Sequence, residues 1–330
     1  MKTKLAVSRR SIALSLPLLL LLLTGCTPSF LITPVSSETT LREETVQSGK
    51  GFARGKIAII EIEGMLMNVR SGGFMQPQEN PVSLFVQQLE KAEKDSDVKA
   101  VVLRINSPGG TVSASDVMYD AVQRFRKNSG KPVVAAAQEV AASGGYYVAC
   151  AADQIVVQPT SIVGSIGVIF QTFDFSGTLA KVGARTESVK SGPMKDMGSF
   201  FKPLGADERQ IMQGMIDEYY QRFQLVVTAG RKLEGQRLAA VADGRVFSGA
   251  QAHAAGLADR TGMLNDAIDL ARELGKAPGA KVILYKRPYG YGGSIYATSP
   301  THQPQANVVN LNLTPPDMVL PTGFYYLWRP

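Results

Sequence analysis

KAVVLRINSPGG, residues 99–110, is an apolar, largely β-branched run that ends in a Pro-Gly-Gly turn. Such a run has the length and composition of a buried strand. A helical pattern follows over about 113–128, and another apolar strand over 131–137. A strand, a helix and a second strand in succession are typical of a βαβ crossover, in which the strands run parallel and helices cover both faces of the sheet. The predicted fold class is therefore α/β.

The same alternation continues on both sides of this unit. The segment 206–231 carries apolar residues at three- and four-residue intervals from Ile211 to Val226, which is typical of an amphipathic helix in a core or an oligomer contact. We expect a loop over 191–204. Further strands are predicted at 56–63, 154–157, 185–189 and 281–285, and further helices at 80–95, 143–152, 175–182, 233–241, 248–255 and 263–274.

The start of the chain has the features of an export signal. Basic residues precede an apolar run from Ile12 to Leu23, which ends in LTGC at 23–26. This ending resembles the lipobox of bacterial lipoproteins, which implies a signal peptide over 1–25 and a lipid on the Cys26 thiol. An uncleaved membrane anchor is the alternative. Both place the body of the chain outside the cytoplasm, on the periplasmic side of a bacterial envelope, and SRR at 8–10 leaves the general secretory and twin-arginine routes open.

Composition gives the remaining boundaries. Residues 26–55 are rich in Ser, Thr and Glu and are predicted to form a tether to the folded domain at 56–287. The tail, 288–330, is rich in Pro, Gly, Asn and Gln and should be largely irregular. Its apolar end, FYYLW at 324–328, is nevertheless expected to dock somewhere.

Charge and residue counts exclude several classes of site. The net charge is +7, but four uncompensated cations lie before Cys26, and the rest carries no basic block interleaved with aromatics, so nucleic-acid binding has no support. Two histidines and two cysteines at unrelated positions do not make a zinc site, and no metal or cofactor is predicted.

Cys150, in a run of small residues, is interpreted as a buried structural thiol. His253 lies in an alanine-rich helix and His302 in the tail, so a serine hydrolase here would use a base other than histidine.

Three segments carry residues suited to acyl transfer. In AASGGYY, 141–147, Ser143 lies at a helix start, where free backbone N–H groups suit a nucleophile, although a helix-capping serine is an equal alternative. The Gly109-Gly110 turn lets backbone amides approach a ligand, and it lacks the phosphate-cradling pattern. The loop KSGPMKD, 190–196, offers two lysines, and a lysine can take a serine proton only in its neutral form, away from water. A solvated loop lysine is the more common case, and the residues alone do not choose between Lys190 and Lys195.

Taken together, five segments resemble the short bacterial form of signal peptide peptidase A, in the ClpP/crotonase superfamily. They occur in the family's order and span about 56–285. The resemblance implies a ClpP/crotonase-like fold with repeated ββα units, and a serine endopeptidase activity. The five segments are NSPGG (106–110), ASGGYY (142–147), VGSIGV (163–168), KSGPMKD (190–196) and DGRVFSGAQAHAAGLAD (243–259).

The resemblance also implies roles for single residues. The family's nucleophile falls on Ser143 and its general base on Lys195. The amide of Gly144 and one from Gly109-Gly110 would form the oxyanion hole, and Ser165 would orient the lysine. The segment DGRVFSG would be structural.

Partners follow from the same resemblance. Short-form members assemble as homo-oligomers in which neighbouring protomers supply the nucleophile and the base. The implied substrates are extended peptides such as signal-peptide remnants, and the lipid anchor would hold the sites at the membrane. A crotonase-like protein that binds acyl-CoA and a scaffold without turnover are the rival functions.

Overall fold

A computed structural model describes residues 40–51, 54–69, 79–287 and 323–328. The predicted signal peptide over 1–25 and Cys26 lie outside these residues. No helix in the described ranges is long and apolar enough to cross a membrane. The strands are β1 (Arg42–Gln47), β2 (Lys56–Leu66), β3 (Val98–Thr111), β4 (Val133–Ala142), β5 (Gln154–Val157), β6 (Ile162–Gly164), β7 (Ile169–Gln171), β8 (Val246–Ser248), β9 (Arg260–Thr261), β10 (Lys281–Lys286) and β11 (Gly323–Leu327). The helices are α2 (Pro81–Lys94), α3 (Val112–Ser129), α4 (Gly144–Ala149), α5 (Ser176–Lys181), α6 (Ala206–Arg231), α7 (Gly235–Ala239), α8 (Gly249–Ala254) and α9 (Leu264–Leu274).

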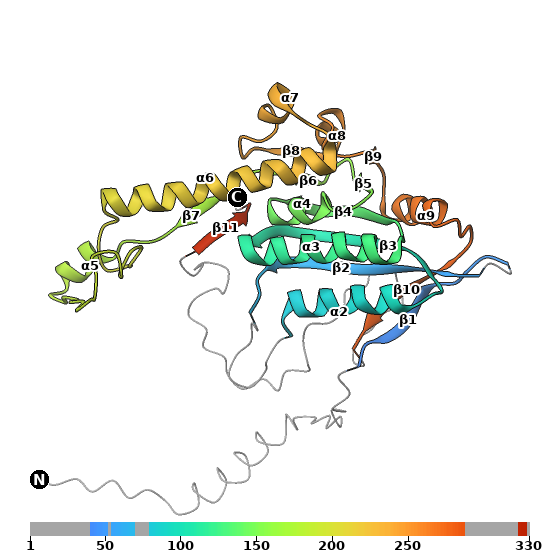
Figure 1. Cartoon of the computed structure of the whole chain (residues 1–330), viewed down its shortest axis with the longest axis horizontal. Coiled ribbons are helices and arrows are strands. Elements are labelled where there is room, and N and C mark those ends of the chain that lie inside the picture. The colour runs from blue at the N-terminus through green and yellow to red at the C-terminus, as the bar shows by residue number, and fades with distance from the viewer. Residues whose placement is uncertain (1–39, 52–53, 70–78, 288–322, 329–330) are drawn as a thin grey trace, which may run out of the picture. The chain divides into compact units, whose positions relative to one another are not determined.

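The centre of the fold is a parallel sheet (Figure 1). Its main path has the order β1-β10-β2-β3-β4-β5-β9, and β1 alone on this path runs antiparallel to its neighbour. Two further strands lie at the carboxyl ends of the central strands. β6 pairs with the last residues of β4, and β11 pairs with the last residues of β3. The predicted α/β class with a mostly parallel sheet is confirmed.

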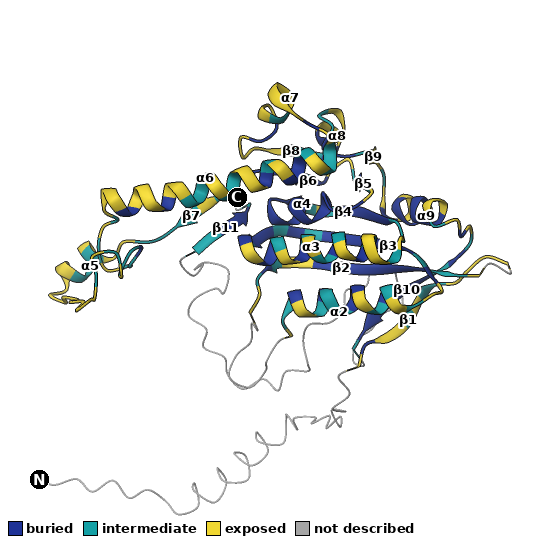
Figure 2. Ribbon diagram, viewed as in Figure 1, coloured by how far each residue is buried: buried dark blue, intermediate teal, exposed yellow. Residues whose placement is uncertain are grey.

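Alternating side chains of the central strands supply two hydrophobic cores. In β2, Ala58, Ile60 and Ile62 pack with α2, α3 and α4 on one face, whereas Ile57 and Ile59 pack with α9 on the other. Both sets are fully buried, as the dark strands in Figure 2 show. Each large aliphatic side chain buried in this way contributes roughly 2 kcal/mol, so burial on both faces fixes the register of the strands.

The helices that follow the strands begin and end at capping residues. The Asn80 Oδ1 accepts hydrogen bonds from the amides of Val82 and Ser83 at the start of α2. The Thr111 Oγ1 accepts from Ala114 N at the start of α3, and Gly130 ends that helix at φ 65°. These caps satisfy backbone groups that the helix leaves unpaired, and they fix where the chain turns back to the next strand.

Three expectations for the elements need correction. The predicted tether at 26–55 contains β1, whose residues pair with β10. The tail predicted to be irregular contains β11, so its apolar end does dock, between β3 and β7. The predicted strand at 185–189 is absent, because those residues pair with no strand and lie exposed.

The residues between β7 and the middle of α6 form an arm that leaves the core. Phe223, Val226 and Val227 in the second half of α6 are buried, whereas the first half is mostly exposed and reaches away from the sheet together with α5 (Figures 1 and 2). The arm carries its own aromatic cluster of Phe173, Phe175 and Phe200. The predicted amphipathic helix therefore serves the core along only part of its length.

Candidate active site

Ser143 forms a tight turn between β4 and α4. Its backbone has φ 50° and ψ −116°, a conformation that costs a residue with a side chain on the order of 1–3 kcal/mol. The Ser143 amide donates to the Gly164 carbonyl oxygen at 2.7 Å, and β4 pairs with β6 up to that point. The sheet therefore holds this residue in its strained conformation.

The Ser143 side chain is buried but unpaired. The residue is 1% exposed, and its Oγ makes no hydrogen bond to any described residue. It does not cap α4, because no helix amide donates to it. Buried hydroxyls usually have a partner, so this one is unusual in a folded core.

Three glycines surround the turn, and each lies where a side chain would not fit. A Cβ on Gly109, which has φ 103°, would lie 2.7 Å from Gly144 N, and one on Gly144 would lie 2.3 Å from Ser115 Oγ. A Cβ on Gly110 would lie 2.0 Å from the Leu66 carbonyl oxygen. Gly109 and Gly144 therefore lie in close contact beside Ser143, whereas Gly110 packs against the end of β2.

Ser107 fixes the glycine turn from within. Its Oγ accepts from Gly109 N at 3.1 Å and donates to the Gly64 carbonyl oxygen at 2.6 Å. The turn is thus tied to the end of β2, and the Gly109 amide already has a partner. We did not predict a role for Ser107 from the sequence, although it lies inside the NSPGG segment.

Ser165 lies one residue beyond the carbonyl that binds the Ser143 amide. It is buried, has φ 52°, and donates its own amide to the Arg245 carbonyl oxygen at 2.8 Å. The following strand β8 pairs with β6, and Phe247 packs where a Cβ on Gly164 would lie. The segment 243–249 thus supports the wall of the site, in line with its expected structural role.

Lys195 lies on the arm, in an exposed loop. Within the described ranges, its ammonium group makes no hydrogen bond or ion pair, and it does not reach Ser143 Oγ.

Asp196, the residue after Lys195, binds Lys190 at 2.6 Å and Lys202 at 2.8 Å. Lys202 also pairs with Glu208 at the start of α6. The hydrogen bonds from Lys190 and then Lys202 lower the pKa of Asp196 to about 2. These ion pairs hold the loop on α6 and leave Lys195 facing outward.

The structure thus brings Ser143, Gly144, Gly109, Gly110 and Ser165 together but leaves Lys195 apart from them within one chain. A residue set that sequence reasoning missed is β11, whose Tyr326 carbonyl lies against the same glycines. The apolar run FYYLW was the only sequence feature that pointed to it.

Family models match the chain in the region that carries this site. The model described as Peptidase family S49 matches residues 125–277, and the one described as Clp protease matches residues 55–163. A putative signal peptide peptidase SppA of Enterococcus faecium is 34% identical over 251 residues, which is 76% of this chain and 72% of that protein.

The chain belongs to the S49 peptidase family.

Other relatives agree with this assignment. A putative protease of Methanocaldococcus jannaschii is 36% identical over 213 residues, 64% of this chain and 68% of that protein. Protease 4 of Haemophilus influenzae is 34% identical over 220 residues, 66% of this chain and 35% of that longer protein. The resemblance to signal peptide peptidase A, the Clp protease-like fold and the activity of a serine-type peptidase are thereby confirmed.

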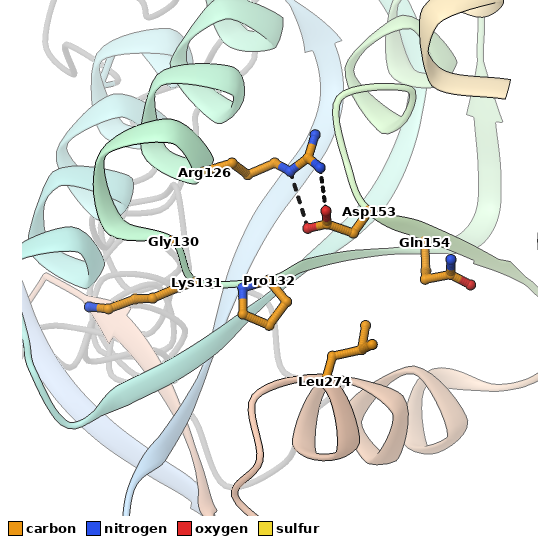
Figure 3. Close-up of a pocket in the computed structure, with 7 residues that line it drawn as sticks. All are labelled: Arg126, Gly130, Lys131, Pro132, Asp153, Gln154 and Leu274. Carbon is orange, nitrogen blue, oxygen red and sulfur yellow. Dashed lines mark hydrogen bonds and ion pairs between the residues drawn. The ribbon is translucent and has the colours of Figure 1, made fainter. Parts of the chain in front are cut away.

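Two surface hollows of this S49 peptidase lie away from Ser143. Figure 3 shows one of about 340 Å³ between the end of α3, the start of β4 and the end of α9. Its charged groups have structural partners, because Arg126 pairs with Asp153 and the Asp153 carboxylate accepts the Val133 amide at 2.8 Å. Lys131 binds three carbonyl oxygens at the end of α2. This hollow lies at the amino ends of the strands, opposite the Ser143 turn.

The remaining titratable candidates also have ordinary positions in the S49 domain. Cys150 is buried, and burial raises the pKa of its thiol to about 12, which fits the predicted structural role. His253 is exposed on α8, and His302 lies outside the described residues. Among the residues that the structure describes, no group of His, Cys, Asp and Glu is arranged to hold a metal ion.

Proposed function

We propose that this serine-type peptidase works as an endopeptidase with a Ser143/Lys195 dyad that hydrolyses extended peptides. The observation that carries the proposal is the Ser143 turn, a strained and buried serine with an unpaired hydroxyl among three close-packed glycines. Strain at a site the sheet must hold in place is typical of a reacting group.

The oxyanion hole is assigned to the amides of Gly144 and Gly110. Gly144 directly follows the nucleophile at the start of α4, where the helix leaves its first amides unpaired. Of the two amides in the glycine turn, that of Gly109 is bound to the Ser107 hydroxyl, so the assignment takes Gly110, which pairs with Tyr326 of β11 in this structure. Two amides aimed at one oxygen would stabilise the negative charge of a tetrahedral intermediate.

The base is assigned to Lys195 of a neighbouring protomer. Within one chain Ser143 Oγ is unpaired and Lys195 is exposed on an arm, so each half of the dyad lacks its partner. The arm also exposes Phe175, Phe201 and Val182, apolar side chains that a protein interface would bury. Insertion of the arm into a second copy would desolvate Lys195 and favour its neutral form. Ser165, in the wall beside Ser143, would then orient the amine.

The reaction is acyl transfer in two steps. Ser143 Oγ attacks the peptide carbonyl carbon and passes its proton to the neutral Lys195 amine. Collapse of the intermediate breaks the C–N bond, and the lysine gives this proton to the departing amine. A water molecule then attacks the Ser143 ester, gives a proton to Lys195, and releases the second product while Ser143 regains its proton. The residues supply every proton transfer, and the proposal includes no cofactor.

The substrates are assigned to peptides at a membrane. After export past the cytoplasmic membrane, a lipid on Cys26 would hold the peptidase at the membrane, where signal-peptide remnants remain after secretion. The chain from residue 26 toward β1 would be the tether. The name of the E. faecium relative supports this substrate class. We place the protein on the periplasmic side of the envelope.

Single substitutions test the dyad. Ser143→Ala and Lys195→Ala should each lower kcat for a fluorogenic peptide by at least about a thousandfold. Lys190→Ala, a matched change on the same loop, should keep activity within a few-fold, because Asp196 retains Lys202. Full activity in the Lys195 variant would overturn the assignment of the base.

A further inference from the structure

The NSPGG segment, 106–110, interrupts the regular pairing of the central sheet. Between β2 and β3 the register shifts around Gly64. Between β3 and β4 it shifts again just before Ser107, which pairs with Ala141. Irregularities of this kind leave backbone groups without a partner in the ladder of the sheet. Side chains must then supply the missing hydrogen bonds.

Ser107 supplies two of these hydrogen bonds with one hydroxyl. Its Oγ donates to the Gly64 carbonyl oxygen at 2.6 Å and accepts from the Gly109 amide at 3.1 Å. Ser107 is completely buried, and its bond to Gly109 is buried as well. Removal of the hydroxyl would therefore leave the Gly109 amide without a partner and free the glycine turn from the end of β2.

The same residue packs against the other half of the proposed oxyanion hole. A Cβ on Gly145 would lie 2.7 Å from the Ser107 carbonyl oxygen and 3.3 Å from the Ser107 Cβ. Gly145 directly follows Gly144, whose amide is the second assigned donor. Ser107 therefore lies between the glycine turn and the first turn of α4, and it contacts both.

The separation of these two segments decides whether their amides can bind one oxygen. The Gly110 amide comes from the end of β3 and the Gly144 amide from the start of α4. Each donor must lie about 2.7–3.1 Å from the oxygen that becomes negatively charged. A shift of one segment against the other would weaken the stabilisation of the transition state more than the binding of the substrate.

We propose that Ser107 is a positioning residue, which holds the Gly110 and Gly144 amides at the separation that the tetrahedral intermediate requires. Ser107 contacts neither the substrate nor the reacting atoms in this proposal, and it acts through the two segments that it joins. The inference rests on the proposed function, because it takes Ser143 as the nucleophile and these two amides as the donors.

A purely structural serine is the alternative, and Ser161 is an example of one. Ser161 is also completely buried, and its Oγ accepts from the Gln158 amide at 3.1 Å and donates to the Gln138 carbonyl oxygen. It thus makes the same two kinds of backbone hydrogen bond as Ser107. Its partners lie in β4 and in the turn between β5 and β6, and neither belongs to the glycine turn or to α4. Ser161 is therefore the matched control.

Alanine substitutions at the two serines provide the first test. In the full-length protein, we expect Ser107→Ala to lower kcat for a fluorogenic peptide at least about thirtyfold, with KM within about threefold of the wild-type value. Ser161→Ala should lower the melting temperature by a similar amount but keep kcat within about threefold. A kcat in Ser107→Ala that is no lower than in Ser161→Ala would overturn the proposal.

A peptide aldehyde separates the geometry of the oxyanion hole from substrate binding. The Ser143 hydroxyl adds across the aldehyde C=O bond and forms a hemiacetal, whose former carbonyl oxygen lies in the hole. The matching peptide alcohol binds without forming this adduct. We expect Ser107→Ala to weaken inhibition by the aldehyde at least about tenfold and inhibition by the alcohol less than about threefold. Equal losses for both compounds would assign Ser107 to substrate binding and contradict the proposal.

A cysteine pair covers the case in which Ser107→Ala does not fold. Cysteine is close to serine in size, and its thiol is only a weak donor and a weak acceptor. We expect a lower kcat in Ser107→Cys than in Ser161→Cys, because only the first change loosens the glycine turn. Equal values would count against a positioning role.

Ser143→Ala, measured in parallel, separates this inference from the proposed function. If Ser143→Ala keeps its activity, the nucleophile is wrongly assigned, and the proposed function falls together with the hole that Ser107 would position. If Ser143→Ala is inactive while Ser107→Ala and Ser161→Ala have the same kcat, the proposed function stands and only the positioning role falls.

Discussion

Ser143 and the glycines beside it place strict limits on the backbone. A positive φ at Ser143 is tolerated because the Gly164 carbonyl and the start of α4 hold it from both sides. Gly109 has φ 103° and lies against Gly144. At this point a side chain would have no room, whatever its chemistry.

Gly109→Ala should therefore abolish peptidase activity. The new Cβ would overlap the chain opposite it and displace the glycine turn, and a displacement of about 1 Å at a reacting site can cost about a hundredfold in rate. Gly130→Ala is the matched control, since Gly130 also has a positive φ but has open space around its Cα. That variant should lose about 1 kcal/mol of stability and keep its activity. Steady-state kinetics with thermal unfolding distinguishes the two, and an active Gly109 variant would contradict the assigned geometry.

Single residues were predictable from the sequence to different degrees. Ser143 and the Gly109-Gly110 turn stand in segments with unusual glycine content, and the structure brings them together. The choice of Lys195 over Lys190 came from the resemblance alone. The ion pair of Lys190 with Asp196 agrees with that choice, and in the proposed site the serine that Lys195 serves belongs to a neighbouring copy.

The arm between β7 and α6 depends on charge pairs at its outer end. Asp196 binds Lys190 and Lys202, and Lys202 is tied to Glu208 in the first turn of α6. Phe200 anchors the loop through the aromatic cluster of the arm. The Asp196 pairs adjoin Lys195, and we expect them to set its position.

Asp196→Asn should lower kcat by about tenfold without unfolding the domain. The amide cannot hold both lysines, so Lys195 would lose its fixed approach to the serine of the neighbouring copy. Global stability should change little, because exposed ion pairs contribute little to it. Asp217→Asn is the control, because Asp217 is exposed on α6, the helix to which the Asp196 loop is tied. This variant should keep its activity. Equal losses in both variants would mean that the charge of the arm, and not the Asp196 pairs, is what matters.

The pH dependence of these pairs has a definite sign. Lys190 and Lys202 lower the pKa of Asp196 to about 2 in the folded chain. The ion pairs of Asp196 are therefore intact at any pH above the ordinary pKa of an aspartate, and they are lost as the pH falls toward 2. Asp196 stays charged between pH 5 and 9, so a change of activity with pH in that range has another origin.

Elements were predictable where hydrophobic periodicity decides the structure. β2, β3, β4, α2, α3, α6 and α9 lie close to their predicted positions because burial against the sheet fixes them. The prediction failed at 185–189, a mostly polar and exposed segment that has no described strand to pair with. β1 was missed because an edge strand with charged residues has the composition of a linker.

At the scale of the whole molecule, the chain divides its chemistry between two places. The core holds a serine with glycines and a covering strand, and the arm holds an exposed lysine. Neither the sequence pattern nor one copy of the chain joins them. The central claim is therefore that each active site is built from two copies, with Ser143 from one and Lys195 from the next.

Complementation between inactive variants tests this claim most directly. Ser143→Ala and Lys195→Ala chains are co-expressed with different affinity tags, mixed oligomers are purified through both tags, and peptide hydrolysis is measured. In a random one-to-one assembly we predict about a quarter of the wild-type activity per subunit, because half of the chains keep the serine and half of their neighbours keep the lysine. Doubly tagged oligomers without activity, while wild-type chains with the same tags are active, would contradict an active site shared between copies.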